Sequence, residues 1–269
     1  MGFRLRLNLK LHARSKSKMS GAGESVWPSM LPKNAMFPPV SILTPTYNRR
    51  KFLPWLMAHI RAQTYPRERM EWVVLDDGSD CVRDLLEPVA TEFNLVYIRS
   101  ETKLNIGEKR NRLHAAARGT ILVNMDDDDY YPPERVAHAV QTLLSKKVDL
   151  VGATRNHLYF TDDASIWEVG PYNPNHGTFG TMAYTKKYAI SHPCDPTVVY
   201  AEEIAFTDNY KTPLAQLDPM KVMLVMCHSE NTFSKNKLRD SPSPMIRKTG
   251  LKLRTFLRKA EMREFYSHA

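Results

Sequence analysis

The feature that most constrains this chain is an apolar run that ends in four consecutive carboxylates. Residues 120–125 have the length and composition of a buried strand, and residues 126–129, all aspartate, follow directly. Adjacent acids repel one another, so a bound cation is an economical way to keep them ionised beside a buried strand. Oxygen ligands without a nearby thiolate suit Mg²⁺ or Mn²⁺. For the run taken alone, a solvated acidic turn is the alternative interpretation.

Strand-like and helix-like segments alternate over the first half of the chain. Apolar runs predict strands at 40–45, 71–75, 95–98 and 120–124, and helical spacing predicts helices at 52–60, 84–93, 107–118 and 132–144. Pro88 should interrupt or kink the second helix, and Gly119 should cap the third in the left-handed conformation. The strands are continuous apolar runs, the pattern of a parallel sheet covered on both faces. We therefore predict an α/β, Rossmann-like, mostly parallel central sheet flanked by helices in a single domain.

Polar clusters follow three of these strands where each strand ends. They are Thr-Pro-Thr-Tyr-Asn at 44–48, Asp-Asp-Gly-Ser at 76–79 and the four aspartates. Because the carboxyl ends of parallel strands share one edge of a sheet, these segments should surround a single crevice. Beyond residue 150 the alternation degrades, with further strands expected near 150–153, 166–169 and 223–226.

The net charge of +9 is concentrated at the two ends of the chain. Residues 1–33 carry +6 and residues 235–269 carry +7, which leaves −4 for residues 34–234. A nucleic-acid-processing core would be basic around its cleft, so this distribution argues against a nucleic-acid substrate. The basic ends are available for peripheral contact with a membrane surface or a partner.

Composition and motifs suggest three segments. We predict a basic, flexible N-terminal segment at 1–37, a folded domain at 38–235 and a basic, amphipathic, helical tail at 236–269, which would pack on its own domain, a partner or a membrane. No apolar run approaches the ~20 residues of a transmembrane helix, and the start lacks a signal-peptide core. Three scattered cysteines are too few for a disulfide framework. We therefore expect a cytoplasmic protein.

Four motifs in register resemble the family 2 glycosyltransferases with the GT-A fold. They are Ser-Ile-Leu-Thr-Pro-Thr-Tyr-Asn from residue 41, Asp-Asp-Gly-Ser from 76, Asn-Ile-Gly-Glu-Lys-Arg-Asn from 105 and Asn-Met-Asp-Asp-Asp-Asp from 124. The resemblance implies an inverting, metal-dependent enzyme, with Mn²⁺ or Mg²⁺ as cofactor. Its donor would be a nucleoside-diphosphate sugar, preferably a UDP-sugar, and its acceptor a hydroxyl of a glycan or glycoprotein.

The same resemblance implies nucleotide-binding residues. Four residues after the first strand would border the base and ribose: Thr44, Pro45, Thr46 and Tyr47. Asp77 would hydrogen-bond the base, although Asp-Gly-Ser is also a turn signal in its own right. Arg110 would lie near the base or phosphate, with a solvated helix residue as the alternative.

Metal-binding residues are implied by the Asp-x-Asp motif, which falls on Asp126 and Asp128. Asp128 would bind the metal and diphosphate directly. Asp126 or Asp127 would contact the ribose or outer-shell water, and Asp129 would support the metal ligands without contacting the ion. His228 lies in a late segment where some GT-A enzymes supply a metal or diphosphate ligand, but a lone histidine is more often structural. A cation bridging the phosphates would stabilise the charge on the leaving diphosphate.

The catalytic base of the family falls in a Glu-Asp pair that opens a helix, and here the pair is Glu202 and Glu203. Glu203 takes the position of the base, with Glu202 beside it. Glutamate in place of aspartate lengthens the side chain by one methylene, so either member of the pair fits the role of the base. Two glutamates at a helix start also simply complement the helix dipole. Trp167, His176 and Thr178 are candidate acceptor contacts.

Two other functions fit part of this pattern. A sugar-1-phosphate nucleotidyltransferase would use a similar acidic metal site, but the chain lacks a glycine-rich phosphate loop with a basic residue after its first strand. A non-catalytic carbohydrate-binding module would bind sugar regardless of metal and nucleotide.

Overall fold

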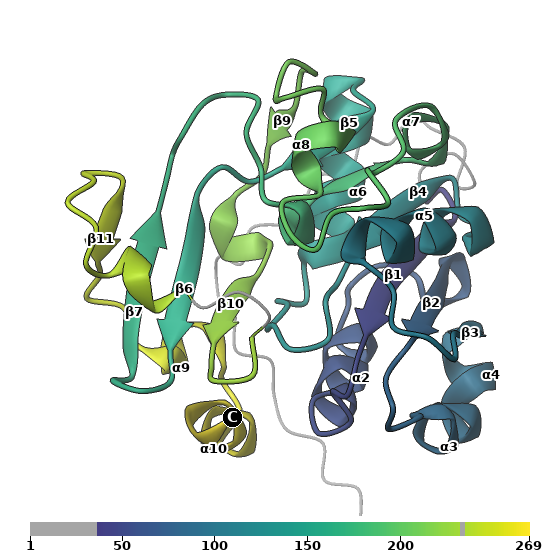
Figure 1. The fold of residues 1–269 in the computed structure, drawn as a ribbon, viewed down its shortest axis with the longest axis horizontal. Helices are drawn as coiled ribbons and strands as arrows, with labels where there is room; N and C mark the ends of the chain where they lie inside the picture. The colour runs from purple at the N-terminus through teal and green to yellow at the C-terminus, as the bar shows by residue number, and fades with distance from the viewer. Residues whose placement is uncertain (1–36, 232–234) are drawn as a thin grey trace, which may run out of the picture.

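The main sheet is built from strands far apart in the sequence. The computed structural model describes residues 37–231 and 235–269, so the predicted N-terminal segment lies outside the described residues except for Phe37. Within them, a seven-stranded sheet has the order β3-β2-β1-β4-β8-β5-β9 (Figure 1). Its strands are β1 (Val40–Thr46), β2 (Met70–Asp76), β3 (Leu95–Arg99), β4 (Ile121–Asn124), β5 (Leu150–Gly152), β8 (Ala183–Thr185) and β9 (Ala215–Gln216).

Parallel pairing joins the first four strands, which confirms the predicted Rossmann-like sheet. β1 lies between β2 and β4 and is parallel to both, and β3 continues the parallel series beyond β2. β8 is antiparallel to β4 and β5. The strand ends that carry the polar motifs therefore meet at one edge, where open α/β sheets bind ligands.

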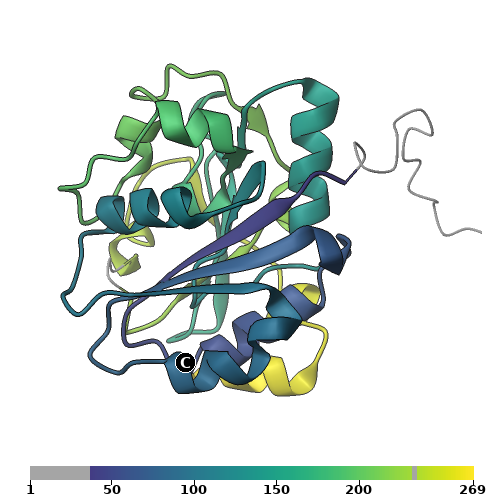
Figure 2. The ribbon, with the colours of Figure 1, turned by 90° about the vertical axis from the view of Figure 1, so that its right-hand side faces the viewer.

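Helices cover both faces of this sheet (Figure 2). Alternate strand residues point to opposite faces, so Ile42 packs with α2 (Leu53–Arg61) and α6 (Arg135–Lys146), whereas Leu43 packs with the other layer. That layer comprises α5 (Ile106–Ala116), α7 (Lys186–Ser191) and α8 (Glu203–Phe206). The predicted helix at 84–93 is two short helices, α3 (Arg83–Leu86) and α4 (Ala90–Phe93), separated at Pro88 by the 3₁₀ turn η2 (Glu87–Val89).

A second sheet incorporates the C-terminal tail. Its strand order is β10-β6-β7-β11, comprising β10 (Leu224–Cys227), β6 (Asn156–Phe160), β7 (Ser165–Val169) and β11 (Ile246–Lys248). β6 and β7 form an antiparallel hairpin, and β11 adds to the outer edge of β7. The tail is thus part strand, followed by the helices α9 (Leu253–Phe256) and α10 (Ala260–His268).

Apolar side chains of the tail pack against the main domain. Leu257 and Tyr266 are fully buried in a cluster that includes Phe52 and Tyr130. Among the described residues, no helix has the length and apolar character needed to cross a membrane.

Gly119 has a different role from the predicted one. Among the described glycines, a positive φ is found at Gly170 and not at Gly119, so Gly119 is not a left-handed cap. A Cβ on Gly119 would lie 2.5 Å from the Ser41 amide nitrogen. The glycine is required because the chain passes directly against β1 at this point.

His59 should make the fold sensitive to acid. It is buried, neither ring nitrogen has a hydrogen-bond partner among the described residues, and burial lowers its pKa to about 3. Protonation therefore favours the unfolded state, where the pKa is ordinary, and stability falls as the pH drops from about 6.5 towards 3. The loss at the acid end is on the order of 4 kcal/mol.

We expect His59→Phe to remove this dependence, because a phenyl ring keeps the contacts with Tyr130 and Tyr266 without titrating. Urea unfolding at pH 7 and pH 4 measures the effect. Wild type should lose more stability between these pH values than the variant, and the exposed control His268→Phe should behave as wild type. Equal losses in wild type and His59→Phe would contradict the assignment.

Candidate active site

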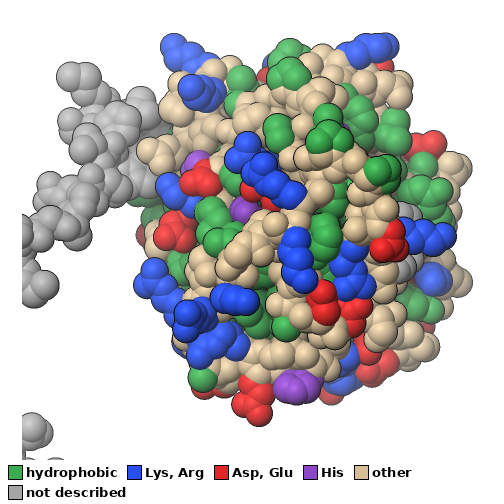
Figure 3. All heavy atoms as spheres, turned by 90° about the vertical axis from the view of Figure 1, so that its left-hand side faces the viewer, with side chains coloured by type: hydrophobic (Ala, Val, Ile, Leu, Met, Phe, Trp, Pro, Cys, Tyr) green, Lys and Arg blue, Asp and Glu red, His purple; other side chains and the backbone are tan. Residues whose placement is uncertain are grey.

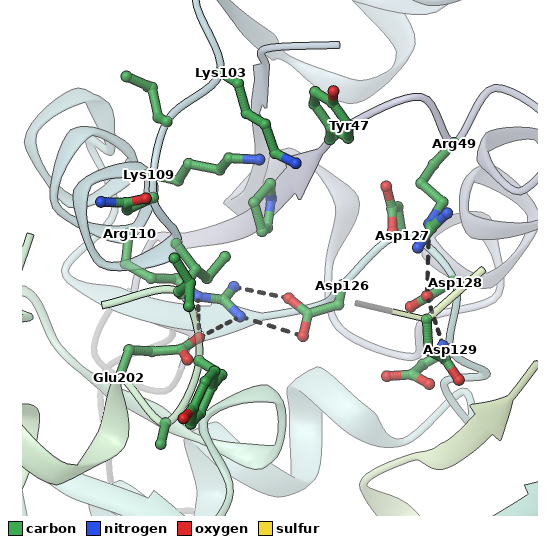
Figure 4. Close-up of a pocket in the computed structure, with 18 of the residues that line it drawn as sticks. Tyr47, Arg49, Lys103, Lys109, Arg110, Asp126, Asp127, Asp128, Asp129 and Glu202 are labelled. Atoms are coloured by element: carbon green, nitrogen blue, oxygen red, sulfur yellow. Dashed lines mark hydrogen bonds and ion pairs between the residues drawn. The ribbon is translucent and has the colours of Figure 1, made fainter. Parts of the chain in front are cut away.

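A cleft of about 500 Å³ lies at the carboxyl edge of the main sheet (Figure 4). Loops from distant parts of the chain form its walls. The residues that line it are Pro45, Tyr47, Arg49, 103–106, Lys109, Arg110, 126–129, 199–202, Asn231 and Lys235. Two of the three polar clusters, at 44–48 and 126–129, contribute lining residues as predicted, whereas no residue of the cluster at 76–79 lines the cleft.

Asp126 is held by Arg110 on the opposite wall. Nη1 and Nη2 of Arg110 donate to the two carboxylate oxygens at 2.7 and 3.3 Å, a bidentate pair that fixes the planes of both groups. Nε of Arg110 donates to Glu202 Oε1 at 3.0 Å. The Arg110 guanidinium also lies 4.7 Å from the centre of the Phe179 ring. Arg110 therefore links the acidic loop to the predicted base pair.

Asp128 has three partners, which come from two other segments of the chain. Its Oδ2 lies 3.2 Å from His228 Nε2 and 3.7 Å from Arg49 Nε, and Asn231 Nδ2 donates to it at 3.2 Å. Although burial raises the pKa of Asp128, the His228 contact and the Arg49 charge hold it below its usual value. Asp128 is therefore the member of the run best kept ionised by the protein itself.

Asp127 and Asp129 lie in less favourable surroundings. Burial and the charge of Asp128 raise the pKa of both carboxyl groups well above the usual value. Oδ2 of Asp127 is buried without a hydrogen-bond partner in the described part of the chain. Oδ1 of Asp129 instead accepts the Met226 amide at 2.8 Å, which ties the loop to β10. An additional positive charge in the cleft would relieve this repulsion.

The two glutamates differ in their surroundings. Glu202 lines the cleft and is paired with Arg110, whereas Glu203 is absent from the lining and opens α8. Burial and the neighbouring Glu202 raise the pKa of Glu203 to about 7. Burial and the Glu203 carboxylate raise the pKa of Tyr210 to about 12, and the Tyr210 ring packs 5.0 Å from that of His176. Glu203 therefore lies towards the side of His176.

Of the four residues predicted to border the nucleotide, two line the cleft: Pro45 and Tyr47. Thr44 does not, because its hydroxyl donates to the Met125 carbonyl and accepts from Trp72 Nε1. Thr46 is buried and is also absent from the lining. Thr44 therefore ties β1 to the residue that precedes the acidic run, whereas the Thr46 hydroxyl has no hydrogen-bond partner in the described part of the chain.

Asp77 also lies behind the cleft wall. Its carboxylate lies 2.6 Å from Lys109 Nζ and accepts the Leu104 amide at 2.7 Å. Direct contact between Asp77 and a base would require one of these partners to move. Asp77 instead positions Lys109, which does line the cleft beside Tyr47.

Removing the Lys109 charge should destabilise the fold. Lys109→Met would leave the buried Asp77 carboxylate without its cation, at a cost of about 3–5 kcal/mol. Urea unfolding measures the loss, and adding Asp77→Asn should recover much of it. The matched control is Arg112→Met, whose exposed pair with Glu108 should be worth under about 1 kcal/mol. Equal effects at the two sites would contradict this account.

Part of the basic side of the cleft was not predicted from the sequence. Arg49, Lys103, Lys109 and Lys235 line the cleft without having been assigned a role. Arg49 follows the first motif directly and Lys109 lies within the third, so their positions in the sequence could have marked them as cleft residues. Trp167, a candidate acceptor contact, lies on β7 of the second sheet with its Nε1 donating to Ser165. Thr178 accepts a hydrogen bond from Asn156 Nδ2 and does not line the cleft.

Comparison with known sequences places the chain in a family. The family model described as glycosyl transferase family 2 matches residues 41–205. The poly(ribitol-phosphate) beta-N-acetylglucosaminyltransferase TarS of Staphylococcus aureus is 32% identical over 68% of this chain and 32% of its own length. An uncharacterized glycosyltransferase of Haemophilus influenzae is 32% identical over 39% of this chain and 34% of its own. The matches thus span about a third of these relatives.

Solved structures agree with this assignment at the level of fold. A crystal structure of S. aureus TarS in complex with UDP-GlcNAc superimposes with a TM-score of 0.60 at 18% identity, covering 72% of this chain and 60% of that one. The mannosyltransferase PcManGT from Pyrobaculum calidifontis, in complex with GDP-Man and Mn²⁺, gives 0.58 at 17% identity, covering 72% and 59%. The chain therefore belongs to glycosyl transferase family 2 and has the GT-A fold.

Proposed function

We propose that this protein transfers a sugar from a nucleoside-diphosphate sugar, preferably a UDP-sugar, to a hydroxyl of a glycan or glycoprotein acceptor with inversion at the transferred carbon. The observation that supports this proposal most is that the cleft has an aromatic and basic side and an acidic side. Tyr47, Lys103 and Lys109 lie on one side of the cleft, and the acidic loop with Arg49 lies on the other. His228 contacts Asp128 from behind and does not line the cleft. The ring of Tyr47 suits the aromatic base of a nucleotide. The lysines, together with a cation held by the acidic loop, suit its diphosphate.

A divalent metal fits the acidic wall. Among the described residues, no cluster of three or more histidine, cysteine, aspartate or glutamate side chains converges to hold an ion alone. Mg²⁺ is usually held by one or two carboxylates with substrate phosphates and water completing its shell, so Asp128 with His228 is a sufficient protein contribution. The unpartnered Asp127 Oδ2 also favours a nearby cation. When bound, Mn²⁺ or Mg²⁺ would neutralise charge on the leaving diphosphate.

Basic side chains of the protein would also neutralise charge on the leaving diphosphate. Arg49, Lys103 and Lys109 line the cleft and are placed to pair with phosphate oxygens. Tyr47 offers a half-buried ring for the base, with Lys103 Nζ 4.3 Å from its centre. Asp126 is oriented by Arg110 and is available to a ribose hydroxyl.

On the acceptor side, we assign Glu203 as the general base and Glu202 as a positioning residue. Glu202 is already paired with Arg110, which disfavours proton uptake. Glu203 makes no ion pair among the described residues and has a pKa of about 7, close to the value at which a base works best in neutral solution. It would remove the acceptor hydroxyl proton as the oxygen attacks the sugar.

A thermal-shift panel of UDP-, GDP- and dTDP-sugars, each with and without Mn²⁺, tests the proposal. A ligand that binds only the folded state raises the melting temperature by mass action. We expect a shift with a UDP-sugar that requires Mn²⁺, followed by release of UDP when acceptor is supplied. Pyrophosphate release from a nucleoside triphosphate and a sugar 1-phosphate would instead favour nucleotidyl transfer. Sugar binding indifferent to metal and nucleotide would favour a binding module.

A further inference from the structure

The short helix α9 and the residues on either side of it carry exposed cations that the proposed reaction does not use. Four basic residues lie within positions 252–259, and no acid occurs between Lys248 and Glu261. We call them the tail patch: Lys252, Arg254, Arg258 and Lys259, all exposed. Figure 3 shows lysine and arginine side chains gathered at the lower left of this face of the molecule.

The tail patch differs from neighbouring cations in having no carboxylate partners. Arg239 is paired with Asp162 at 2.6 Å, and Arg247 with Glu168 at 2.5 Å. By contrast, none of the four patch residues forms an ion pair in the described part of the chain. Their charge is therefore directed at solvent and is available to an anionic partner.

The patch is attached firmly to the catalytic domain. Phe256 and Leu257, which lie between the patch cations in the sequence, are buried against the domain. Tyr266 of α10 is also buried, and its hydroxyl donates to the Asp129 carbonyl at 3.4 Å. A surface that engages the patch would therefore hold the acidic loop, and with it the cleft, in a fixed orientation.

We propose that the tail patch docks the protein on an anionic membrane surface. Leu251 and Leu253 are half-buried beside the cations, and such an alternation of cations with partly exposed apolar groups suits the headgroup boundary of a bilayer. A soluble polyanion would pair with the cations but would offer no apolar environment to Leu251 and Leu253. A bilayer offers anionic headgroups to the cations and an apolar boundary to the leucines, so the combination favours the membrane.

Vesicle co-sedimentation of the full chain tests the proposal. Wild type should bind vesicles of phosphatidylglycerol and phosphatidylcholine, bind pure phosphatidylcholine far less, and dissociate at high salt. Each patch cation should contribute about a fivefold factor, so neutralising all four should weaken partitioning on the order of several hundredfold. The test variant combines four substitutions: Lys252→Gln, Arg254→Gln, Arg258→Gln and Lys259→Gln.

A matched control removes the same charge elsewhere. It combines four substitutions of exposed lysines: Lys146→Gln, Lys187→Gln, Lys211→Gln and Lys221→Gln. We expect the control to keep most of the vesicle binding, and both variants to keep donor turnover in free solution. Residues 1–36 are common to all three proteins, so any contribution from them leaves the comparison valid. Absent vesicle binding by wild type, equal losses in the two variants, or binding only to a soluble polyanion such as heparin would overturn the proposal.

Discussion

Asp128→Asn should lower sugar transfer by a factor of about 100 to 1,000 while leaving the protein folded. Asp128 is the carboxylate that His228 and Arg49 keep ionised at the cleft, and the proposed metal and diphosphate depend on it. Removing a preorganised electrostatic contact at a charge that develops in the transition state typically costs this much. Measuring UDP release with saturating donor, acceptor and Mn²⁺ gives the effect.

The melting temperature of ligand-free Asp128→Asn separates this loss from unfolding. It should change little, because the weakened contacts with His228 and Arg49 are offset by the relief of repulsion with Asp127 and Asp129. The matched control is Asp129→Asn, which keeps an oxygen to accept the Met226 amide and should retain much more activity. Full activity of Asp128→Asn in excess chelator would exclude the proposed metal role.

Glu203→Gln should lower transfer by a factor of about 100 to 10,000 while donor binding stays intact. The amide cannot take the acceptor proton, and proton transfer by a positioned base is worth about this much. Because burial and Glu202 raise the pKa of Glu203 to about 7, wild-type kcat/KM should rise with pH to a midpoint near 7 and then level off. The variant should lack this rise.

Comparison of the two glutamates makes the assignment specific. Glu202→Gln breaks a charged contact with Arg110, so it should alter donor affinity as well as turnover. Glu203→Gln should leave the Mn²⁺-dependent thermal shift by donor unchanged. Unchanged turnover in Glu203→Gln, or a midpoint near pH 7 that persists in it, would remove Glu203 from the mechanism.

The parallel core of the fold could be predicted because its signals are local. The strands β1, β2 and β4 are continuous apolar runs, and each ends in a recognisable polar cluster. β8 and β9, with three and two residues, are too short to carry a pattern, and their pairing depends on the rest of the sheet. The tail strand β11 was predicted as helix because its basic and apolar residues fit either period, and the free edge of β7 decides the outcome.

The candidate site could be located from sequence, but the contacts of individual side chains could not. The hydroxyl of Thr44 is occupied by Trp72 and Met125, which are 28 and 81 positions away. The buried pair of Asp77 with Lys109 similarly depends on how α5 packs beside β2. Partners distant in the sequence therefore decide which residues of a motif face the cleft. These partners cannot be predicted from a local sequence pattern.

A crystal structure with UDP and Mn²⁺ would locate the ion directly through manganese anomalous scattering. We expect one manganese peak within bonding distance of Asp128, with the diphosphate beside it and the base near Tyr47. Ordered UDP outside this cleft, or a manganese site that does not involve Asp128, would contradict this expectation.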